Sequence, residues 1–512
     1  MTPVISRPIS PDDSTSSPGS TRRNRAFEIA VAVLIGVGFF LLLRATPDVP
    51  GGFDGYRHVK QASRLITEPR AMFADPWHLA YFWNKPVDPW FGYHLLLAPF
   101  TMVFDLITAA KLFSSVIFGL IAYVMFQLLR QLNARHRAYW VLLTMTGSAI
   151  TLSRAATVRP FLLSLLLTLL AALWTVTDKP VKVALVALLH ALSYSMFLLV
   201  AITPFFWLLM RRDRRSVLAA LCAAAGVVLG LLANPYFPEN LRFDVVQASV
   251  VSLGQKAHVR MGGELYPAGS WWWLVASLPI AVPWLGAVIL RLWRGRKTSC
   301  PIADLFLVMS MVTFLGTFRV VRTADFFFPF AILFAAAVIS PYLTASRASL
   351  AGMGILLALP CVVNVYLTRQ YVKEAPSLAR FRGAAEYLRL NAPGALVANT
   401  QWNDYQLLFF LNSRNRYLIG IEPTFMYLAA PGKYWLWQHI SDDEASTCGH
   451  EACTDGERTD IVSALRQELG ADYVLTDHGL NPNLERILGA ESNVAEVYRD
   501  AAFSLYRVDS IN

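Results

Sequence analysis

A carboxylate and an imidazole lie four residues apart, at Asp54 and His58, shortly after the first long apolar run of the chain. On a helix, residues at this spacing share a face. A carboxylate held near a membrane surface can take a proton from a hydroxyl or an amide, which makes Asp54 a candidate catalytic base and His58 its helper. Asp is also a favoured N-cap, here of a helix that would run to Ile66. The spacing alone leaves both interpretations open.

Four arginines stand at ends of apolar runs that the charge pattern assigns to the non-cytoplasmic side: Arg154, Arg159, Arg319 and Arg322. Membrane proteins normally keep positive charge out of short loops on that side. A basic residue there calls for an anionic partner, and a lipid phosphate is the obvious candidate. Arg319 and Arg322 are one helical turn apart, so both can face one pocket. The alternative for Arg322 is a local ion pair with Asp325.

The loop that carries Asp54 adds three further candidate substrate-binding residues, Lys85, Asp88 and His94. As a phosphate ligand, Lys85 would act as a point charge. Beside Pro86 it could instead extend along the membrane interface without binding substrate.

A later outer loop contains Gly262 and Gly263 directly before Glu264. Two glycines indicate a mobile segment able to close over a substrate, so Glu264 is a third candidate catalytic residue. The sequence shows no nucleotide-binding glycine loop, Ser-His-Asp order or Cys/His metal array. We therefore assign no metal ligand; nothing requires a divalent metal cofactor and nothing excludes one.

The elements that must position these residues are membrane helices. The chain has 512 residues, of which 55% are hydrophobic and only 16% charged. This composition predicts a polytopic α-helical membrane protein. The net charge of +10 lies mostly in short loops between apolar runs, which is the usual topological signal and argues against nucleic acid as a partner.

The pattern predicts a disordered cytoplasmic tail over residues 1–25 and a transmembrane region over 26–370, with a first outer loop at 44–93. Basic loops alternate with apolar runs and give about eleven spans. The expected spans are 27–43, 109–129, 138–152, 160–176, a helical hairpin over 183–210, 217–232, 271–290, 305–318, 326–339 and 350–367.

Residues 371–512 are predicted to form a soluble α/β domain on the outer side. Short apolar runs at 395–398, 417–420 and 472–475 indicate buried strands, and 460–469 has the apolar spacing of a helix. In this domain Cys448 and Cys453 bracket four residues. A disulfide is the preferred interpretation in an oxidising compartment, and a metal site with His450 is the alternative.

These residues together resemble the GT-C superfamily of membrane glycosyltransferases. Asp54, followed by Gly55-Tyr56-Arg57-His58, is similar to the acidic motif in the first outer loop of that superfamily. Lys85-Pro86 is similar to the Lys-Pro-Pro of the lipid A aminoarabinose and protein mannosyl transferases, with Val87 in place of the second proline. The segment 319–325 resembles the basic segment before a late span, and 399–405 with 417–424 resembles the soluble domain of bacterial members.

The resemblance implies an inverting transfer of a sugar from a polyprenyl-phosphate or diphosphate donor to a glycan, lipid or protein acceptor. The site would lie on the outer face of a bacterial inner membrane, with the C-terminal domain in the periplasm. Asp54 would act as base, and the arginines and Lys85 would bind the lipid phosphate and stabilise its developing charge. Trp402, Tyr405 or Glu422 would contact the acceptor.

Two other function classes share some of these features. A transporter or flippase of lipid-linked sugars would also need outer arginines, but it should show polar residues within several spans and internal repeats. The sequence shows little of either. A non-catalytic assembly scaffold is less consistent with so many charged residues in the first outer loop.

Overall fold

The computed structural model describes residues 18–70, 86–252, 259–266, 273, 276–294, 300–343, 346–454 and 456–509. Lys85 and residues 1–17 of the predicted tail lie outside this part of the chain. Helix α1 spans Pro18–Leu43, so it begins within the tail predicted over residues 1–25. A helix already formed by an apolar run extends by further residues at little cost, which accounts for the earlier start.

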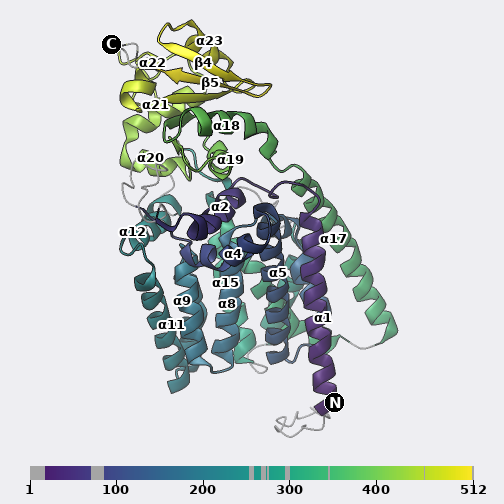
Figure 1. Cartoon of the computed structure of the whole chain (residues 1–512). Helices are drawn as coiled ribbons and strands as arrows, with labels where there is room; N and C mark the ends of the chain where they lie inside the picture. Colours follow the sequence, from purple (N-terminus) through teal and green to yellow (C-terminus); the bar gives the residue numbers. More distant parts are fainter. Residues whose placement is uncertain are drawn as a thin grey trace, which may run out of the picture.

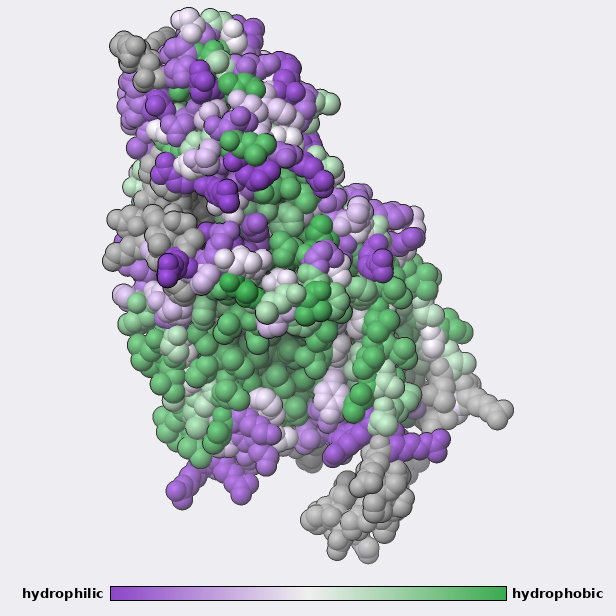
Figure 2. All heavy atoms as spheres, in the orientation of Figure 1, coloured by the Kyte–Doolittle hydropathy of each residue, from purple (hydrophilic) through white to green (hydrophobic). Residues whose placement is uncertain are grey.

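A bundle of apolar helices forms the lower part of the molecule in Figure 1, with the N-terminus at its lower end. Figure 2 shows apolar residues as a band across this bundle, with hydrophilic residues below and above it. Such a band identifies a polytopic membrane protein, because lipid-facing side chains must be apolar. The helices of the bundle are α1, α5 Leu106–Gln131, α6 Arg137–Thr146, α7 Ala149–Ala155, α8 Pro160–Val176, α9 Pro180–Ser193, α10 Leu199–Arg211, α11 Arg214–Ala233, α14 Leu278–Arg294, α15 Pro301–Thr317, α16 Ala324–Ile339 and α17 Arg347–Lys373.

Within the described residues, five helices are long and apolar enough to cross a bilayer, and the bent pair α7–α8 would make a sixth. Five shorter apolar helices of 10–17 residues accompany them. The predicted number of about eleven spans stays a prediction. The hairpin predicted over residues 183–210 is confirmed as two helices, α9 and α10, separated by residues 194–198.

The span predicted over residues 138–152 is divided into two helices. After α6 ends, the Ser148 hydroxyl caps α7 by accepting a hydrogen bond from the Thr151 amide. Helix α8 begins at Pro160, a residue suited to the first helical turn. Helices α7 and α8 are bent by 109° relative to each other. Arg154 and Arg159 therefore flank a sharp bend.

Shorter helices form a layer above the bundle (Figure 1): α2 Asp54–Thr67, α4 Phe91–Val103 and α12 Glu239–Val246. Helix α4 was not predicted, because its apolar run of 13 residues is too short to cross a membrane and was divided between a loop and a connection. Gly92 brings α4 close to α9, since a Cβ there would lie 2.5 Å from the Ser193 Oγ.

The C-terminal domain contains a five-stranded sheet in the order β2-β1-β3-β5-β4. Strand β1 is parallel to β2 and β3, whereas β5 is antiparallel to β3 and β4. The predicted α/β class is confirmed, although β4 and β5 were not predicted. The strands are β1 Leu396–Asn399, β2 Arg416–Tyr417, β3 Tyr473–Asp477, β4 Val494–Arg499 and β5 Phe503–Val508, and the surrounding helices are α18 Arg382–Asn391, α19 Asp404–Leu411, α20 Pro423–Ala429, α21 Pro431–Ser441, α22 Ile461–Ser463 and α23 Pro482–Ala490.

Alternate residues of the central strands face two separate cores. Val397 and Leu475 belong to a core that continues into the membrane bundle, whereas Ala398 and Val474 belong to a core on the other face of the sheet. This alternation follows from the two-residue repeat of a strand. The domain is therefore built onto the bundle through one face of its sheet.

Helix α19 docks this domain on α2. Tyr56 meets the edge of the Phe410 ring with 5.2 Å between centroids, and the Arg64 guanidinium lies 5.6 Å from the centre of the Phe409 ring. The Tyr56 hydroxyl also donates to the Pro376 carbonyl at 3.3 Å. These contacts hold the first outer helix between the bundle and the C-terminal domain.

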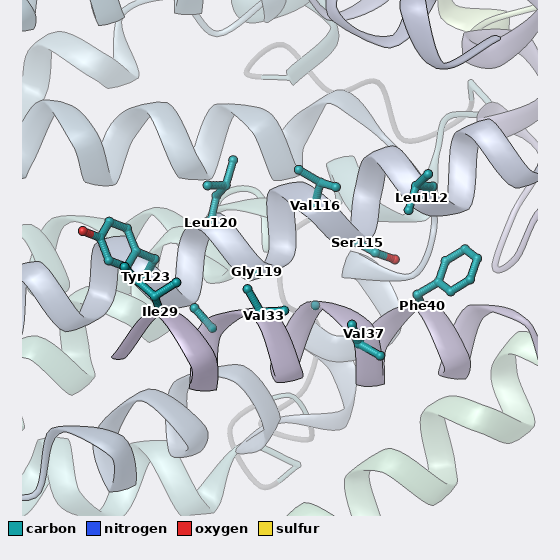
Figure 3. Close-up of a pocket in the computed structure, with 12 residues that line it drawn as sticks. Ile29, Val33, Val37, Phe40, Leu112, Ser115, Val116, Gly119, Leu120 and Tyr123 are labelled. Atoms are coloured by element: carbon teal, nitrogen blue, oxygen red, sulfur yellow. The ribbon is translucent and has the colours of Figure 1, made fainter. Parts of the chain in front are cut away.

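Helices α1 and α5 approach each other at Gly36 and Gly119, and an apolar groove of about 580 Å³ follows their junction (Figure 3). A Cβ at position 119 would lie 3.0 Å from the Ala32 carbonyl oxygen. Glycine is required for this close approach. The groove lies away from the polar outer layer, and its lining includes Val33, Val116 and Tyr123.

Candidate functional site

Asp54 is the first residue of α2, and the N-cap position belongs to Phe53. The N-cap alternative for Asp54 is therefore wrong, although the predicted helix is present. The next residue, Gly55, allows α2 to lie on the turn after α7, because a Cβ there would be 3.2 Å from the Thr157 carbonyl oxygen and 2.6 Å from Val49. That turn leads directly to Arg159.

Two residues contact the Asp54 carboxylate, one from the membrane bundle and one from the C-terminal domain. Arg159, just before α8, places its Nη2 atom 3.2 Å from Oδ2 of Asp54. Gln406 of α19 donates from Nε2 to Oδ1 at 3.3 Å. The Asp54 side chain stays 27% exposed, so these contacts orient the carboxylate and leave part of it open to a ligand.

Asp54 lines a polar cavity of about 370 Å³. Four parts of the chain form its wall: α2 with the residue before α4, the α7–α8 bend, the outer segments after α9, α12 and α15, and the C-terminal domain. The lining residues are Phe53, Asp54, Arg57, His58, Trp90, Arg154, Thr157, Arg159, Pro160, Ser195, Gln247, Gly262, Gly263, Leu265, Arg322, Tyr371, Trp402, Asn403, Ile421 and Glu422.

Four arginines belong to this wall, together with the carboxylates of Asp54 and Glu422. Arg154 donates from Nε to both oxygens of Asp325, at 2.8 and 3.0 Å, and its guanidinium lies 5.3 Å from the centre of the Phe161 ring. The Arg322 guanidinium lies 5.2 Å from the centre of the Tyr194 ring. Asp325, which the alternative interpretation paired with Arg322, binds Arg154. Arg57 and Arg159 complete the group.

The other predicted site residues do not reach this cavity or are not described. Arg319 is exposed and absent from the cavity wall, so the structure does not place it beside Arg322 in one pocket. Helix α15 ends at Thr317 and a 3₁₀ turn spans Val321–Thr323, so the regular helical spacing on which that expectation depended is lost. Glu264 lies in a short turn, Gly263–Leu265, and both neighbours of Glu264 line the cavity.

The predicted substrate-binding residues Asp88 and His94 lie behind the wall, fully buried. His94 Nδ1 is 2.6 Å from Asp88 Oδ2, and His94 Nε2 is 2.8 Å from His58 Nδ1. On the other side of the His58 ring, Nε2 is 3.2 Å from Arg57 Nη2. A continuous row of hydrogen-bonding groups therefore runs from Asp88 to the cavity-lining Arg57. We call these four residues the imidazole row.

Burial shifts the pKa values of two residues of this row, His58 and Arg57. Desolvation lowers the pKa of His58 well below its ordinary value, and the nearby charge of Arg57 lowers it further. Desolvation also lowers the pKa of Arg57, while the carboxylates of Asp54 and Asp88 raise it. His58 is therefore a neutral ring at physiological pH, able to accept a hydrogen bond on one nitrogen and donate from the other.

Residues that the sequence did not single out complete the site. Arg57 follows Asp54 by three residues on α2, and this one-turn spacing was a usable signal. Gln406 and Asn403 come from a domain far along the chain, and no local pattern indicates them. Of the proposed acceptor contacts, Trp402 and Glu422 line the cavity, whereas Tyr405 is buried.

Potential metal ligands meet at one place among the described residues, where His439 lies beside Cys448 and Cys453. The two cysteines form a disulfide with 5.7 Å between their Cα atoms, as predicted. His450 contributes its carbonyl there, at 3.3 Å from Cys448 Sγ. A disulfide sulfur is a poor metal ligand, because metals bind thiolates.

We compared this protein with known families, curated proteins and solved structures. No family model and no curated protein matches the sequence. Among solved structures, the oligosaccharyltransferase of Archaeoglobus fulgidus in its apo form is similar, with a TM-score of 0.64 and 12% identity over 88% of this chain and 69% of that one. The same enzyme, AglB, in complex with an inhibitory peptide and a dolichol-phosphate gives a TM-score of 0.61 and 11% identity over 91% of this chain and 71% of that one.

ArnT from Cupriavidus metallidurans bound to undecaprenyl phosphate is similar over nearly the whole of both chains, 96% of this one and 98% of that one. The TM-score is 0.57 and the identity 13%. Identities this low establish a shared fold, and the roles of individual residues must come from the site itself.

Proposed function

We propose that this protein, which has the GT-C fold of polytopic membrane glycosyltransferases, transfers a sugar from a polyprenyl-phosphate or diphosphate donor to an acceptor. One observation carries the proposal: Asp54 and four arginines line the same cavity at the end of an apolar bundle. A scattered set of arginines far from Asp54 would have argued against an enzyme. The transfer would take place on the outer face of a bacterial inner membrane.

In this reaction an acceptor hydroxyl or amide attacks the anomeric carbon as the bond from that carbon to the phosphate oxygen breaks. The acceptor proton passes to Asp54 and the electron pair leaves with the lipid phosphate. A single displacement inverts the anomeric centre and needs one base. Asp54 is suited to this role because it lies at the cavity and is held from two sides, by Arg159 and Gln406.

The arginines of the cavity would stabilise the leaving phosphate. Guanidinium groups bind phosphate oxygens in pairs and keep their charge when partly desolvated. Charge increases on the phosphate as the bond breaks, so fixed positive groups favour the transition state over the ground state.

The C-terminal domain would bind the acceptor. Trp402 offers a ring face of the kind that sugars and peptides pack against, and Glu422 offers a carboxylate on the same wall. The amide of Gly262 donates to both oxygens of Glu422, at 3.2 and 3.0 Å, which joins the outer glycine segment to this domain. Any movement of this segment would therefore reshape the acceptor side of the cavity.

The proposal is tested by Asp54→Asn in proteoliposomes supplied with polyprenyl-phosphate sugars. The variant keeps the size of the side chain and removes the base, so we expect turnover to fall by about 100-fold or more while donor binding is not weakened. Asp178→Asn is the matched control, because Asp178 follows the end of α8 opposite to Arg159 and Pro160 and binds Arg211 and Arg215. Wild-type turnover by the Asp54 variant would remove Asp54 from the mechanism.

A further inference from the structure

The imidazole row has a fixed direction, which follows from the groups at its two ends. At one end, the Asp88 carboxylate accepts the Trp90 amide at Oδ1, 3.0 Å away, and faces His94 Nδ1 with Oδ2. An ionised carboxylate can only accept hydrogen bonds. At the other end, Arg57 can only donate. Every hydrogen bond between the two ends must therefore point from Arg57 toward Asp88.

This direction assigns one tautomer to each ring. His94 carries its proton on Nδ1 and donates it to Asp88, which leaves His94 Nε2 as an acceptor. His58 donates from Nδ1 to that atom and accepts the Arg57 Nη2 proton at its own Nε2. The two imidazole rings thus connect the buried Arg57 guanidinium to the buried Asp88 carboxylate. Each hydrogen bond within the imidazole row has one donor and one acceptor.

Asp88 also fixes the aromatic support of the same guanidinium. The amide that binds Asp88 Oδ1 belongs to Trp90, and the Arg57 guanidinium lies 4.5 Å from the centre of the Trp90 ring. One carboxylate therefore orders both the ring against which Arg57 packs and the hydrogen bonds that reach its Nη2 atom. All of Asp88, His94, His58 and Arg57 are at most 2% exposed as residues.

We infer that Asp88, His94 and His58 are positioning residues that hold the Arg57 guanidinium at the cavity wall in the orientation needed to bind the phosphate of a lipid-linked ligand. The inference rests on the proposed function, since it presumes that the cavity takes a lipid phosphate. An arginine fixed before the ligand arrives loses less side-chain entropy on binding, so its hydrogen bonds contribute more to affinity. Asp88 and His94 act through Arg57 and do not touch the ligand themselves.

An isosteric change at Asp88 would reverse the direction of the hydrogen bonds in the imidazole row. The amide of Asp88→Asn has one accepting oxygen, which cannot serve both the Trp90 amide and His94. If that oxygen stays with Trp90, the amide nitrogen faces His94 and forces its proton to Nε2. His58 must then carry its proton on Nε2, where it meets the Arg57 Nη2 protons as donor against donor.

The experiment measures binding to purified full-length protein of three probes: undecaprenyl phosphate, neutral undecaprenol and inorganic phosphate. For wild type we expect undecaprenyl phosphate to bind more tightly than undecaprenol; equal binding of the two would contradict the proposed function itself. For Asp88→Asn we expect the dissociation constant for undecaprenyl phosphate to rise about 10-fold, the usual effect of losing one charged hydrogen bond. Undecaprenol binding should be unchanged.

Asp244→Asn is the matched control, because Asp244 is another buried carboxylate of the outer layer and lies outside the cavity wall. Its affinity for undecaprenyl phosphate should equal that of wild type. Inorganic phosphate tests whether the lipid chain is needed. If Asp88→Asn weakens the binding of undecaprenyl phosphate and of inorganic phosphate to the same degree, Arg57 contacts the phosphate group itself.

A double-mutant cycle separates positioning from general stability. In an Arg57→Gln background, Asp88→Asn should cause no further loss of affinity, because the residue through which it acts is gone. An equal loss in both backgrounds, or wild-type affinity of Asp88→Asn alone, would overturn the inference.

Two variants at His94 cover the case in which Asp88→Asn fails to fold. The amide of His94→Gln can donate toward Asp88 and accept from His58, so it should preserve much of the affinity. His94→Leu can do neither and should lose about 10-fold. Equal affinities for these two variants would also contradict the inference.

Discussion

The ion pair between Asp54 and Arg159 gives each residue two roles. Arg159 pairs with the carboxylate that is proposed to take a proton. A donor phosphate would compete for the same guanidinium. We expect donor binding to draw Arg159 toward the phosphate and to leave the Asp54 carboxylate open to the acceptor.

Arg159 and Arg319 make a matched pair for testing this assignment at the scale of single residues. Arg159→Gln removes a cavity cation, so we expect the KM for the lipid-linked donor to rise about 10-fold or more. Arg319 is exposed and outside the cavity wall, so Arg319→Gln should change KM by about 2-fold at most. Initial rates at varied donor concentration measure both, and similar changes in the two variants would contradict the cavity assignment.

The sequence predicted part of the cavity lining, since Asp54, Arg154, Arg159 and Arg322 line one cavity. The arginines could be singled out because basic residues are rare at helix ends that the charge pattern assigns to the non-cytoplasmic side. Arg319 does not join them, since its position depends on where α15 ends. Asp88 and His94 were recognised as unusual, but a sequence cannot show whether a polar residue faces a ligand or supports one that does.

The breaks between helices determine where the cavity residues lie, and these breaks were the hardest features to predict. Charges marked the ends of some helices, such as α10 at Arg211 and α14 at Arg294, and the two helices α9 and α10 follow the prediction. The break between α6 and α7 depends on Gly147 and the Ser148 cap, and both residues also occur inside straight membrane helices. The bend after Ala155 is fixed by tertiary contacts, among them the contact of Gly55 with the Thr157 carbonyl.

The contact between α1 and α5 yields a prediction at the scale of helices. Gly119→Val should lower the thermal midpoint, because a Cβ already lies 3.0 Å from the Ala32 carbonyl oxygen and two further methyl groups would force the helices apart. Overpacking of this kind costs about 1–3 kcal/mol. Gly38→Val on the partner helix α1 is the control, since a Cβ there would meet nothing within 4 Å.

Thermal unfolding in detergent, followed by tryptophan fluorescence, compares the two glycine variants. Donor KM should remain that of wild type in both, because neither residue lines the cavity. Equal midpoints for the two variants would show that α1 and α5 do not need their close approach.

At the scale of the whole molecule, the C-terminal domain and the bundle share one core, and α19 lies at their junction. Asp404, the first residue of α19, is next to the cavity-lining Asn403. Burial raises the pKa of Asp404 to about 8; the charge of Asp477 raises it and that of Arg380 lowers it. Arg380 donates to Asp477 at 2.6 Å, so its charge is shared between the two acids.

A raised pKa predicts how stability depends on pH. Between pH 3.8, the ordinary pKa of this carboxyl group, and about pH 8, the folded protein keeps a proton on Asp404 that the unfolded chain has lost. Stability from this residue is therefore full at low pH and is lost as pH rises through that window. Asp404→Asn cannot lose a proton, so its thermal midpoint should match wild type near pH 4 and exceed it by about 2 °C or more at pH 8. A constant difference across this range would contradict the assignment.

The general class of the molecule was predictable because apolar length, loop charge and strand alternation are local properties of the sequence. The docking of the domain was not, because it joins residues more than 300 positions apart, such as Tyr56 with Pro376 and Asp54 with Gln406. No local pattern encodes such pairs.

The contact of Gln406 with Asp54 has a consequence for biosynthesis. A ribosome delivers Asp54 to the membrane about 350 residues before it delivers the glutamine, as their sequence separation of 352 requires. The cavity would thus remain incomplete after the first helices have been inserted, until Trp402 and Glu422 have been synthesised. A polypeptide interrupted before that moment would carry Asp54, the proposed base, and yet lack Trp402 and Glu422, the proposed acceptor contacts, so the proposed transfer could begin only after those residues have been made.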